Sequence, residues 1–254
     1  MNAILTIALN TFRETLRDKV FYNLVIYALL MIGSALVLGM LSIGEHGKII
    51  KDIGLATIDL FGVLLAIFVG VGLISREIER RTIYTIIAKP VHRYQFLLGR
   101  YAGLALTMWV NTGIMLAAFC LILVMEGMTP DIGIMEAVGL ITIAQLIVLA
   151  AAVLFSSFTT PTLGGIFTLA LYVIGELTPD LKLVSDKLPV GPVRELLIGL
   201  YYLLPNLALF NVKGEAVHGV PVTGEYMMMA VAYGLTYAAL VLFASCIVFQ
   251  RRDF

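Results

Sequence analysis

Long apolar stretches separated by short polar segments dominate the pattern of this chain. The stretches that carry no charge, apart from Asp59 in the second, are Val20–Leu41, Leu55–Ser75, Tyr101–Met125, Ala137–Gly175 and Tyr226–Phe249. A helix rises 1.5 Å per residue and needs about 20 apolar residues to cross the hydrocarbon core of a bilayer. Each stretch is therefore long enough to predict at least one membrane span.

The fourth stretch predicts two spans. Its 39 residues are about twice the length that one crossing needs. It contains the polar segment Ser156–Pro161, which ends in a helix-breaking proline. We therefore expect an all-α polytopic membrane protein, a single transmembrane domain over residues 1–254. Its six spans are predicted at about 20–41, 55–75, 101–125, 137–158, 161–178 and 226–249.

Composition supports a lipid environment and argues against a soluble enzyme. Hydrophobic residues make up 60% of the chain and charged residues 13%, whereas a soluble domain is typically ~25% charged. The 17 basic and 17 acidic residues cancel, so no basic excess indicates nucleic acid as a partner. Cys120 and Cys246 lie in apolar stretches and are interpreted as small buried hydrophobes. Neither H-E-x-x-H nor C-x-x-C occurs, so no metal site is predicted.

The basic residues predict the orientation. Six spans place 11 of the 17 basic residues on one side, in the N-terminal segment, in residues 76–100 and at the C-terminus. The positive-inside rule makes this side cytoplasmic, so both termini are expected there, in the cytoplasmic (inner) membrane. Residues Ile43–Gly54 and the segment 179–225 are then expected outside.

Two further elements flank the spans. Residues 2–19 alternate polar and apolar side chains at helical spacing, which predicts an amphipathic helix at the membrane interface. Within the outer segment 179–225, Val193–Leu204 is apolar but too short to cross, so we expect a short re-entrant or interfacial helix.

The loop 76–100 carries the most informative pattern. Ile78, Thr82 and Ile86 recur at helical spacing beside a dense charged cluster, and Pro90 ends the predicted helix. By itself this pattern fits a solvated positive-inside loop as well as a helix that docks on a soluble partner.

The same loop resembles the loop between the second and third spans of ABC-transporter permeases of the ABC-2 exporter type. The residues that match in order and spacing are Glu77, Glu79, Thr82, Pro90, Arg93, Gly99 and Arg100. The six-span layout, the amphipathic N-terminal helix, the long outer segment and the basic tail extend the resemblance over essentially the whole chain. His92 departs from the pattern, where the family often has a small hydroxyl residue, and histidine is a poor N-cap.

The resemblance implies a division of labour. Such permeases form the membrane path as a dimer, here a homodimer or a pair with a close paralogue, and each copy carries a separate ATP-binding cassette ATPase subunit. ATP and Mg would bind that partner and no cofactor would bind this chain, which lacks G-x-x-x-x-G-K-[ST] and is not expected to be an enzyme. The loop would act as a coupling helix in a cleft of the ATPase. The residues expected to bind the ATPase are Glu77, Glu79, Arg80, Arg81, Thr82, Lys89, Pro90, His92 and Arg93.

Polar residues in or beside the spans are candidates for the transport pathway. These are Asp59, Asn111, Gln145 and Glu176. An ionisable residue in a membrane is a functional hypothesis by default, but Asp59 and Glu176 lie near outer ends, where reaching water or pairing with an outer basic residue explains them as well.

Three other functions were weighed against export. An ion-coupled secondary transporter needs ionisable residues at mid-membrane, and the spans are almost wholly apolar there. An intramembrane enzyme needs a catalytic set that this sequence lacks. A permease that transmits ATPase motion to an outer partner through Pro179–Gly224 remains open, as does the substrate.

Overall fold

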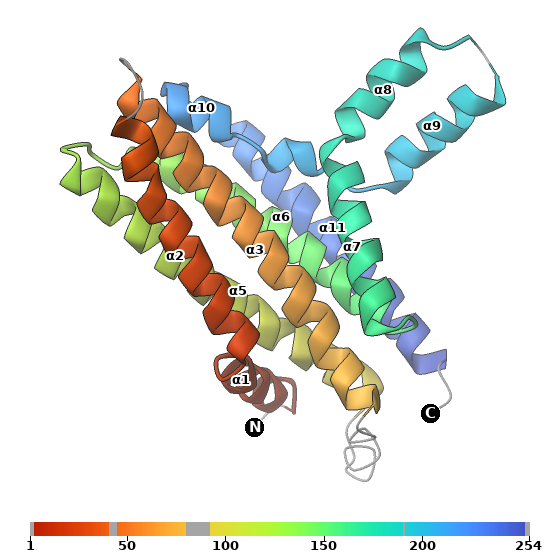
Figure 1. Cartoon of the computed structure of the whole chain (residues 1–254). Coiled ribbons are helices and arrows are strands. Elements are labelled where there is room, and N and C mark those ends of the chain that lie inside the picture. The colour runs from red at the N-terminus through yellow and green to blue at the C-terminus, as the bar shows by residue number, and fades with distance from the viewer. Residues whose placement is uncertain (1–2, 41–44, 80–91, 190, 252–254) are drawn as a thin grey trace.

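The computed structural model describes residues 3–40, 45–79, 92–189 and 191–251, with backbone alone for 73–79 and 251. Secondary structure in these ranges is helical, which confirms the all-α prediction (Figure 1). The elements are α1 Ala3–Thr15, α2 Lys19–Met40, α3 His46–Glu79, α5 Arg93–Met125, α6 Ile132–Ser156, α7 Pro161–Glu176, α8 Thr178–Lys187, α9 Pro192–Leu203, η1 Leu207–Phe210, α10 Lys213–His218 and α11 Gly224–Arg251.

Five of these helices are long and apolar enough to cross a membrane. They are α2, α3 over His46–Gly72, α5, α6 and α11 over Gly224–Gln250. The break predicted at Ser156–Pro161 is confirmed, because α6 ends at Ser156 and α7 begins at Pro161. However, α7 has 16 residues and bends by 59° into α8, so the predicted span 161–178 is a shorter helix with a kink at its end.

The connection between the first two predicted spans is shorter than the sequence indicated. The predicted start of the second span at Leu55 is wrong, since α3 begins at His46, whereas the placement of Ile43–Gly54 outside stays a prediction. Charged side chains in this first part of α3 are paired instead of lying in a loop. His46 bonds the Glu126 carboxylate at 2.8 Å and Lys51 pairs with Asp131. These contacts let α3 continue past the apolar stretch that starts at Leu55.

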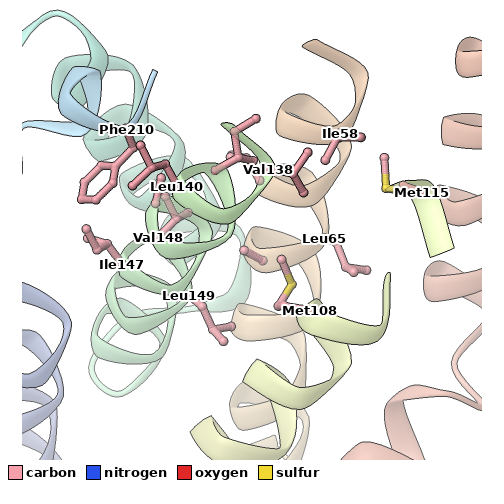
Figure 2. Close-up of a cluster of buried hydrophobic side chains, with 14 of the residues drawn as sticks. Ile58, Leu65, Met108, Met115, Val138, Leu140, Ile147, Val148, Leu149 and Phe210 are labelled. Atoms are coloured by element: carbon pink, nitrogen blue, oxygen red, sulfur yellow. The ribbon is translucent and has the colours of Figure 1, made fainter. Parts of the chain in front are cut away.

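The core is built around α6, which packs against α3, α5, α7 and α11. Figure 2 shows Val138 and Leu149 of α6 on the side of Ile58 and Leu65 of α3 and Met108 of α5, whereas Leu140 and Ile147 lie on the side of Phe210. α6 is apolar on all sides, as expected for a helix enclosed by others. Glycines let α3 approach its neighbours closely: Phe119 packs over Gly54 and Gln145 over Gly62.

The segment 179–225, which the sequence predicts to lie outside, contains an arm. The helices α8 and α9 pack on each other and extend away from the bundle (Figure 1). The short apolar helix predicted at Val193–Leu204 is α9, and none of its residues is buried. A bend of 43° separates α9 from the segment Leu207–His218, which returns along α6 and α3.

Candidate functional site

Two long helices flank the predicted coupling loop. α3 runs without a break from His46 to Glu79 and α5 begins at Arg93. The predicted ATPase-binding residues Arg80, Arg81, Thr82, Lys89 and Pro90 lie outside the described residues. For Glu77 and Glu79 the structure gives the helical backbone alone, so those predictions stay untested.

The first turn of α5 is described, and its contacts fix the base of the loop. His92 lies at the N-cap with extended backbone, and its N–H donates to Oε1 of Gln95 at 3.2 Å. Gln95 thus caps the start of the helix, a task for which the histidine side chain is poorly suited. Arg93 donates to the carbonyl of Gln250 in α11 at 3.2 Å. The end of α11 is therefore attached to the start of α5.

The N-terminal helix is also attached to α5. Gly99 and Gly103 lie one turn apart on α5, and α1 crosses there: Ile7 lies over Gly99, and Ala8 and Thr11 lie over Gly103. This G-x-x-x-G spacing allows two helix backbones to approach closely. The helix predicted over residues 2–19 is thus present as Ala3–Thr15 and packs against α5 along one side, while its place at the membrane interface stays a prediction.

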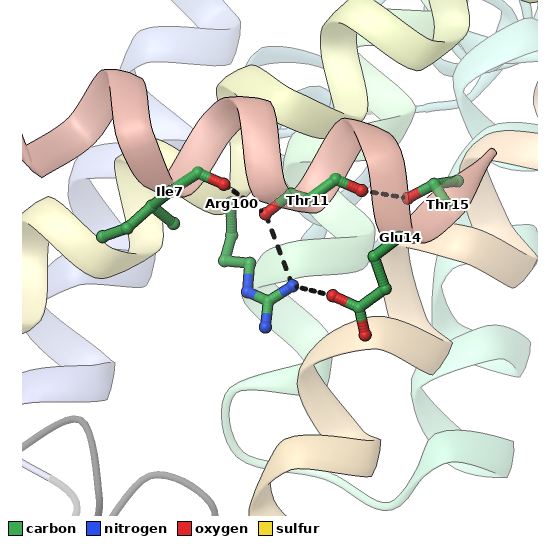
Figure 3. A network of polar contacts seen from close by, with 5 residues as sticks. All are labelled: Ile7, Thr11, Glu14, Thr15 and Arg100. Atoms are coloured by element: carbon green, nitrogen blue, oxygen red, sulfur yellow. Dashed lines mark hydrogen bonds and ion pairs between the residues drawn. The ribbon is translucent and has the colours of Figure 1, made fainter. Parts of the chain in front are cut away.

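An ion pair between a buried arginine and a half-exposed glutamate completes this contact. Figure 3 shows Arg100 of α5 reaching α1, where it donates to the Glu14 carboxylate at 2.8 Å and to the Thr11 hydroxyl at 3.3 Å. The Arg100 side chain is 6% exposed and that of Glu14 52%. The Thr11 and Thr15 hydroxyls donate to carbonyls one turn earlier, so both threonines are buried without an unsatisfied donor.

Aromatic contacts bring α11 to the same place. The Arg100 guanidinium lies 5.4 Å from the Phe96 ring centroid, and Phe96 stacks on Phe249 of α11 at 6.2 Å. The helices α1, α5 and α11 thus meet beside the base of the loop. We call this contact the terminal junction, defined by Glu14, Phe96, Gly99, Arg100, Gly103 and Phe249.

Two of the four pathway candidates are buried between helices. Gln145 of α6 accepts from the Thr112 hydroxyl of α5 at 3.1 Å and donates to the Ile58 carbonyl of α3 at 3.1 Å. The Asn111 amide of α5 lies 3.5 Å from the Met115 sulfur. Both side chains are at most 2% exposed. The two Gln145 bonds join α3, α5 and α6, whereas the Asn111 contact lies within α5, so both residues serve the packing of the bundle.

The other two candidates lie close to each other, near the end of the bundle that is expected outside. Asp59 of α3 is 7% exposed and accepts from Lys213 of α10 at 2.6 Å. Glu176, at the end of α7, is an electrostatic neighbour of both. Asp59 therefore pairs with a basic residue of the segment expected outside, one of the two structural explanations that the sequence leaves open. We call Asp59, Glu176 and Lys213 the outer triad.

The sequence did not reveal which residues contact each other at the terminal junction or in the outer triad. Gly99-x-x-x-Gly103 is a recognisable helix-packing signal that points to α5 as a contact helix, but it does not say which helix crosses there. Lys213 lies 154 residues from Asp59, and no local pattern links them.

Comparison with models of known protein families identifies the family of this chain. Residues 55–254 match a family described as "Protein of unknown function (DUF2705)". The chain belongs to this family. The match begins inside α3 and includes the outer triad and most of the terminal junction. A comparison with curated proteins finds no match. The function of this DUF2705 protein must therefore be argued from its geometry.

Proposed function

We propose that this DUF2705 protein is the membrane-spanning permease subunit of an ATP-driven ABC transporter, of exporter type, which couples to a separate ATPase subunit through residues 76–100. The observation that carries the proposal is the helix pair around that loop. α3 has 34 residues and α5 has 33, so each is about 50 Å long against a hydrocarbon core of about 30 Å. A force applied at the loop would therefore be transmitted along continuous helices into the bundle.

The terminal junction supports a six-span topology. α1 and the end of α11 both contact the first turns of α5, so the chain begins and ends its crossings at one end of the bundle. An even number of crossings is needed for this. Five helices have the length of a span, and α7, which follows the hairpin after α6, supplies the sixth crossing in this proposal.

A second candidate function rests on the arm. None of the residues of α9 is buried, and α8 and α9 stand away from the bundle (Figure 1). A subunit that passes ATPase motion to an outer partner would need such a surface. An ion-coupled secondary transporter is disfavoured, since Asn111 and Gln145 are neutral and bonded inside the bundle.

Membrane topology gives the first test. We expect a cysteine placed at Lys89 to be protected from an impermeant thiol reagent in intact cells, and one placed at the exposed Asp186 of α8 to be labelled after mild permeabilisation of the cell surface, because the basic residues gather at the end of the bundle where both termini lie. Background labelling is removed with Cys120→Ala and Cys246→Ala. Labelling at Lys89 without labelling at Asp186 would reverse the proposed orientation.

Partner binding gives the second test. We expect an ATPase subunit to co-purify with the chain in mild detergent, and charge reversal at Glu77, Glu79, Arg80 or Arg81 to lower the stimulated ATPase rate. Losing one member of a buried interfacial ion pair costs about 2–5 kcal/mol and an exposed one far less, so the four variants should differ. Lys187→Glu on α8, far from the loop, is the control. The chain alone is expected to hydrolyse no ATP.

Two results would count against this proposal. Hydrolysis by the chain after removal of every partner would contradict the division of labour. Unchanged co-purification and activity in all four loop variants would leave residues 76–100 as an ordinary positive-inside loop.

A further inference from the structure

An apolar groove of about 630 Å³ lies between the first turn of α2, the second half of the α3 span and the first half of α7. Its lining includes Val20, Leu64, Phe68, Gly72, Pro161 and Gly165. The side chains of the lining are nonpolar except for Thr162. Phe68 and Ile166 at the rim are each 55% exposed, so the groove opens sideways on the surface that faces lipid.

The length of the groove matches one leaflet. Its lining extends from Leu64 to Gly72 on α3 and from Pro161 to Leu169 on α7. Either run of eight steps rises about 12 Å, against about 15 Å for half of the hydrocarbon core. Val20 and Pro161 stand at the starts of their helices, so this is the leaflet at the end of the terminal junction.

Positive charge lies at that end of the groove. Lys19 immediately precedes Val20, and both Lys19 and Arg17 are exposed. Between them, the Asp18 carboxylate accepts from the Val20 N–H at 2.9 Å and so faces the helix start. The N-terminus of α7 lies at the same end, and its N-cap residue Thr160 makes no side-chain capping bond. Helix N-termini favour negative charge, so an occupant with an anionic head and an apolar tail fits.

We propose that this groove binds an anionic phospholipid, with one acyl chain along α3 and α7 and the phosphate at Lys19 and Arg17. Phospholipid reaches the lateral opening directly from the bilayer, and basic residues at this surface attract anionic headgroups. Gly165 provides part of the space, since a Cβ there would meet only Ile67 Cγ2, at 3.9 Å. The site goes beyond the proposed transporter function, because lipid binding needs no ATPase.

Photocrosslinking in vesicles tests the site. The full chain is reconstituted in equimolar phosphatidylcholine and phosphatidylglycerol, with a trace of phosphatidylglycerol that carries an acyl-chain diazirine, and modified peptides are identified by mass spectrometry. We expect residues 64–72 and 161–169 to be labelled more strongly than 235–247 of α11, where Leu240 is equally open to lipid at 62% exposed. Gly165→Phe should reduce the groove labelling to the α11 level.

Matched variants separate the alternatives. Gly113→Phe on α5 adds the same ring where a Cβ meets no atom within 4 Å, and should leave labelling unchanged. Lys19→Gln should reduce the preference for phosphatidylglycerol over phosphatidylcholine about fivefold, the effect of one charge at an anionic surface. Even labelling over all exposed spans, or equal loss in both glycine variants, would overturn the proposal. So would a disulfide between two copies through Leu169→Cys, because a second copy would then cover the groove.

The readout is independent of the ATPase test. Groove labelling without a co-purified ATPase would reject the transporter and keep the lipid site. Co-purification of an ATPase together with even labelling of all exposed spans would reject the lipid site and keep the transporter.

Discussion

Gly103→Leu is expected to detach α1 from the bundle, whereas the same substitution at Gly113 of α5 is expected to change little. A Cβ at Gly103 would overlap the carbonyl oxygen of Ala8 and lie 2.6 Å from the Thr11 Cβ. The Ala8 oxygen is a backbone atom, so no change of side-chain rotamer can relieve the overlap. At Gly113 the same Cβ meets no atom within 4 Å.

The loss should be large because steric and electrostatic effects add. Overpacking a close contact costs about 1–3 kcal/mol. Separating the helices also breaks the bond between Arg100, 6% exposed, and Glu14. Breaking a buried pair costs about 3–5 kcal/mol, and less here because Glu14 already reaches water. We therefore expect a loss of about 3 kcal/mol or more in the free energy that holds α1.

Limited proteolysis measures this directly. Trypsin should cleave at Arg13 and Arg17 much faster in Gly103→Leu than in the parent protein, with the Gly113→Leu protein as control. Glu14→Gln, which removes the charge and keeps the shape, should lie between them. Cleavage at the parent rate in Gly103→Leu would mean that α1 is held elsewhere.

The spans could be predicted because their signals are local. An uncharged stretch of 39 residues interrupted by Ser156–Pro161 cannot be one straight helix, and the structure breaks it there. The start of α3 was misplaced for the opposite reason. A charged residue such as Lys51 predicts that the span begins after it. Its pairing with Asp131 instead allows α3 to begin before it, at His46. Such pairing depends on residues far along the chain.

The candidate sites show the same difference between local features, which the sequence predicts, and long-range contacts, which it does not. The sequence picked out Asp59 and Gln145 as polar residues in apolar surroundings, which is a local property. It did not reveal that Gln145 bonds the Ile58 carbonyl, or that α1 crosses α5 at Gly99 and Gly103. Amphipathicity predicted that α1 has two faces, but the buried face includes Thr11 and Thr15 because their hydroxyls bond within the helix.

Lys213→Met is expected to destabilise the outer segment far more than Asp59→Asn. In the outer triad one cation serves two carboxylates, and the side chains of Lys213 and Asp59 are 19% and 10% exposed. Removing Lys213 leaves the buried Asp59 and the half-buried Glu176 as neighbouring like charges without this counter-ion. The expected cost is about 3–5 kcal/mol, the range for a buried ion pair that loses one partner. After Asp59→Asn, Lys213 keeps Glu176 as a neighbour, so the cost should be about 1 kcal/mol.

Thermal unfolding in detergent and proteolysis of the arm measure the difference. Lys213→Met should lower the unfolding temperature and speed cleavage within α8 and α9, because α10 is no longer held to α3. The exposed Lys187, at the end of α8, provides the control variant Lys187→Met, for which no change is expected. Adding Asp59→Asn to Lys213→Met should recover part of the loss, since it removes one of the two unpaired charges. Equal unfolding temperatures for Lys213→Met and Lys187→Met, or no recovery in the double variant, would show that α10 is held by its apolar contacts and that the triad contributes little.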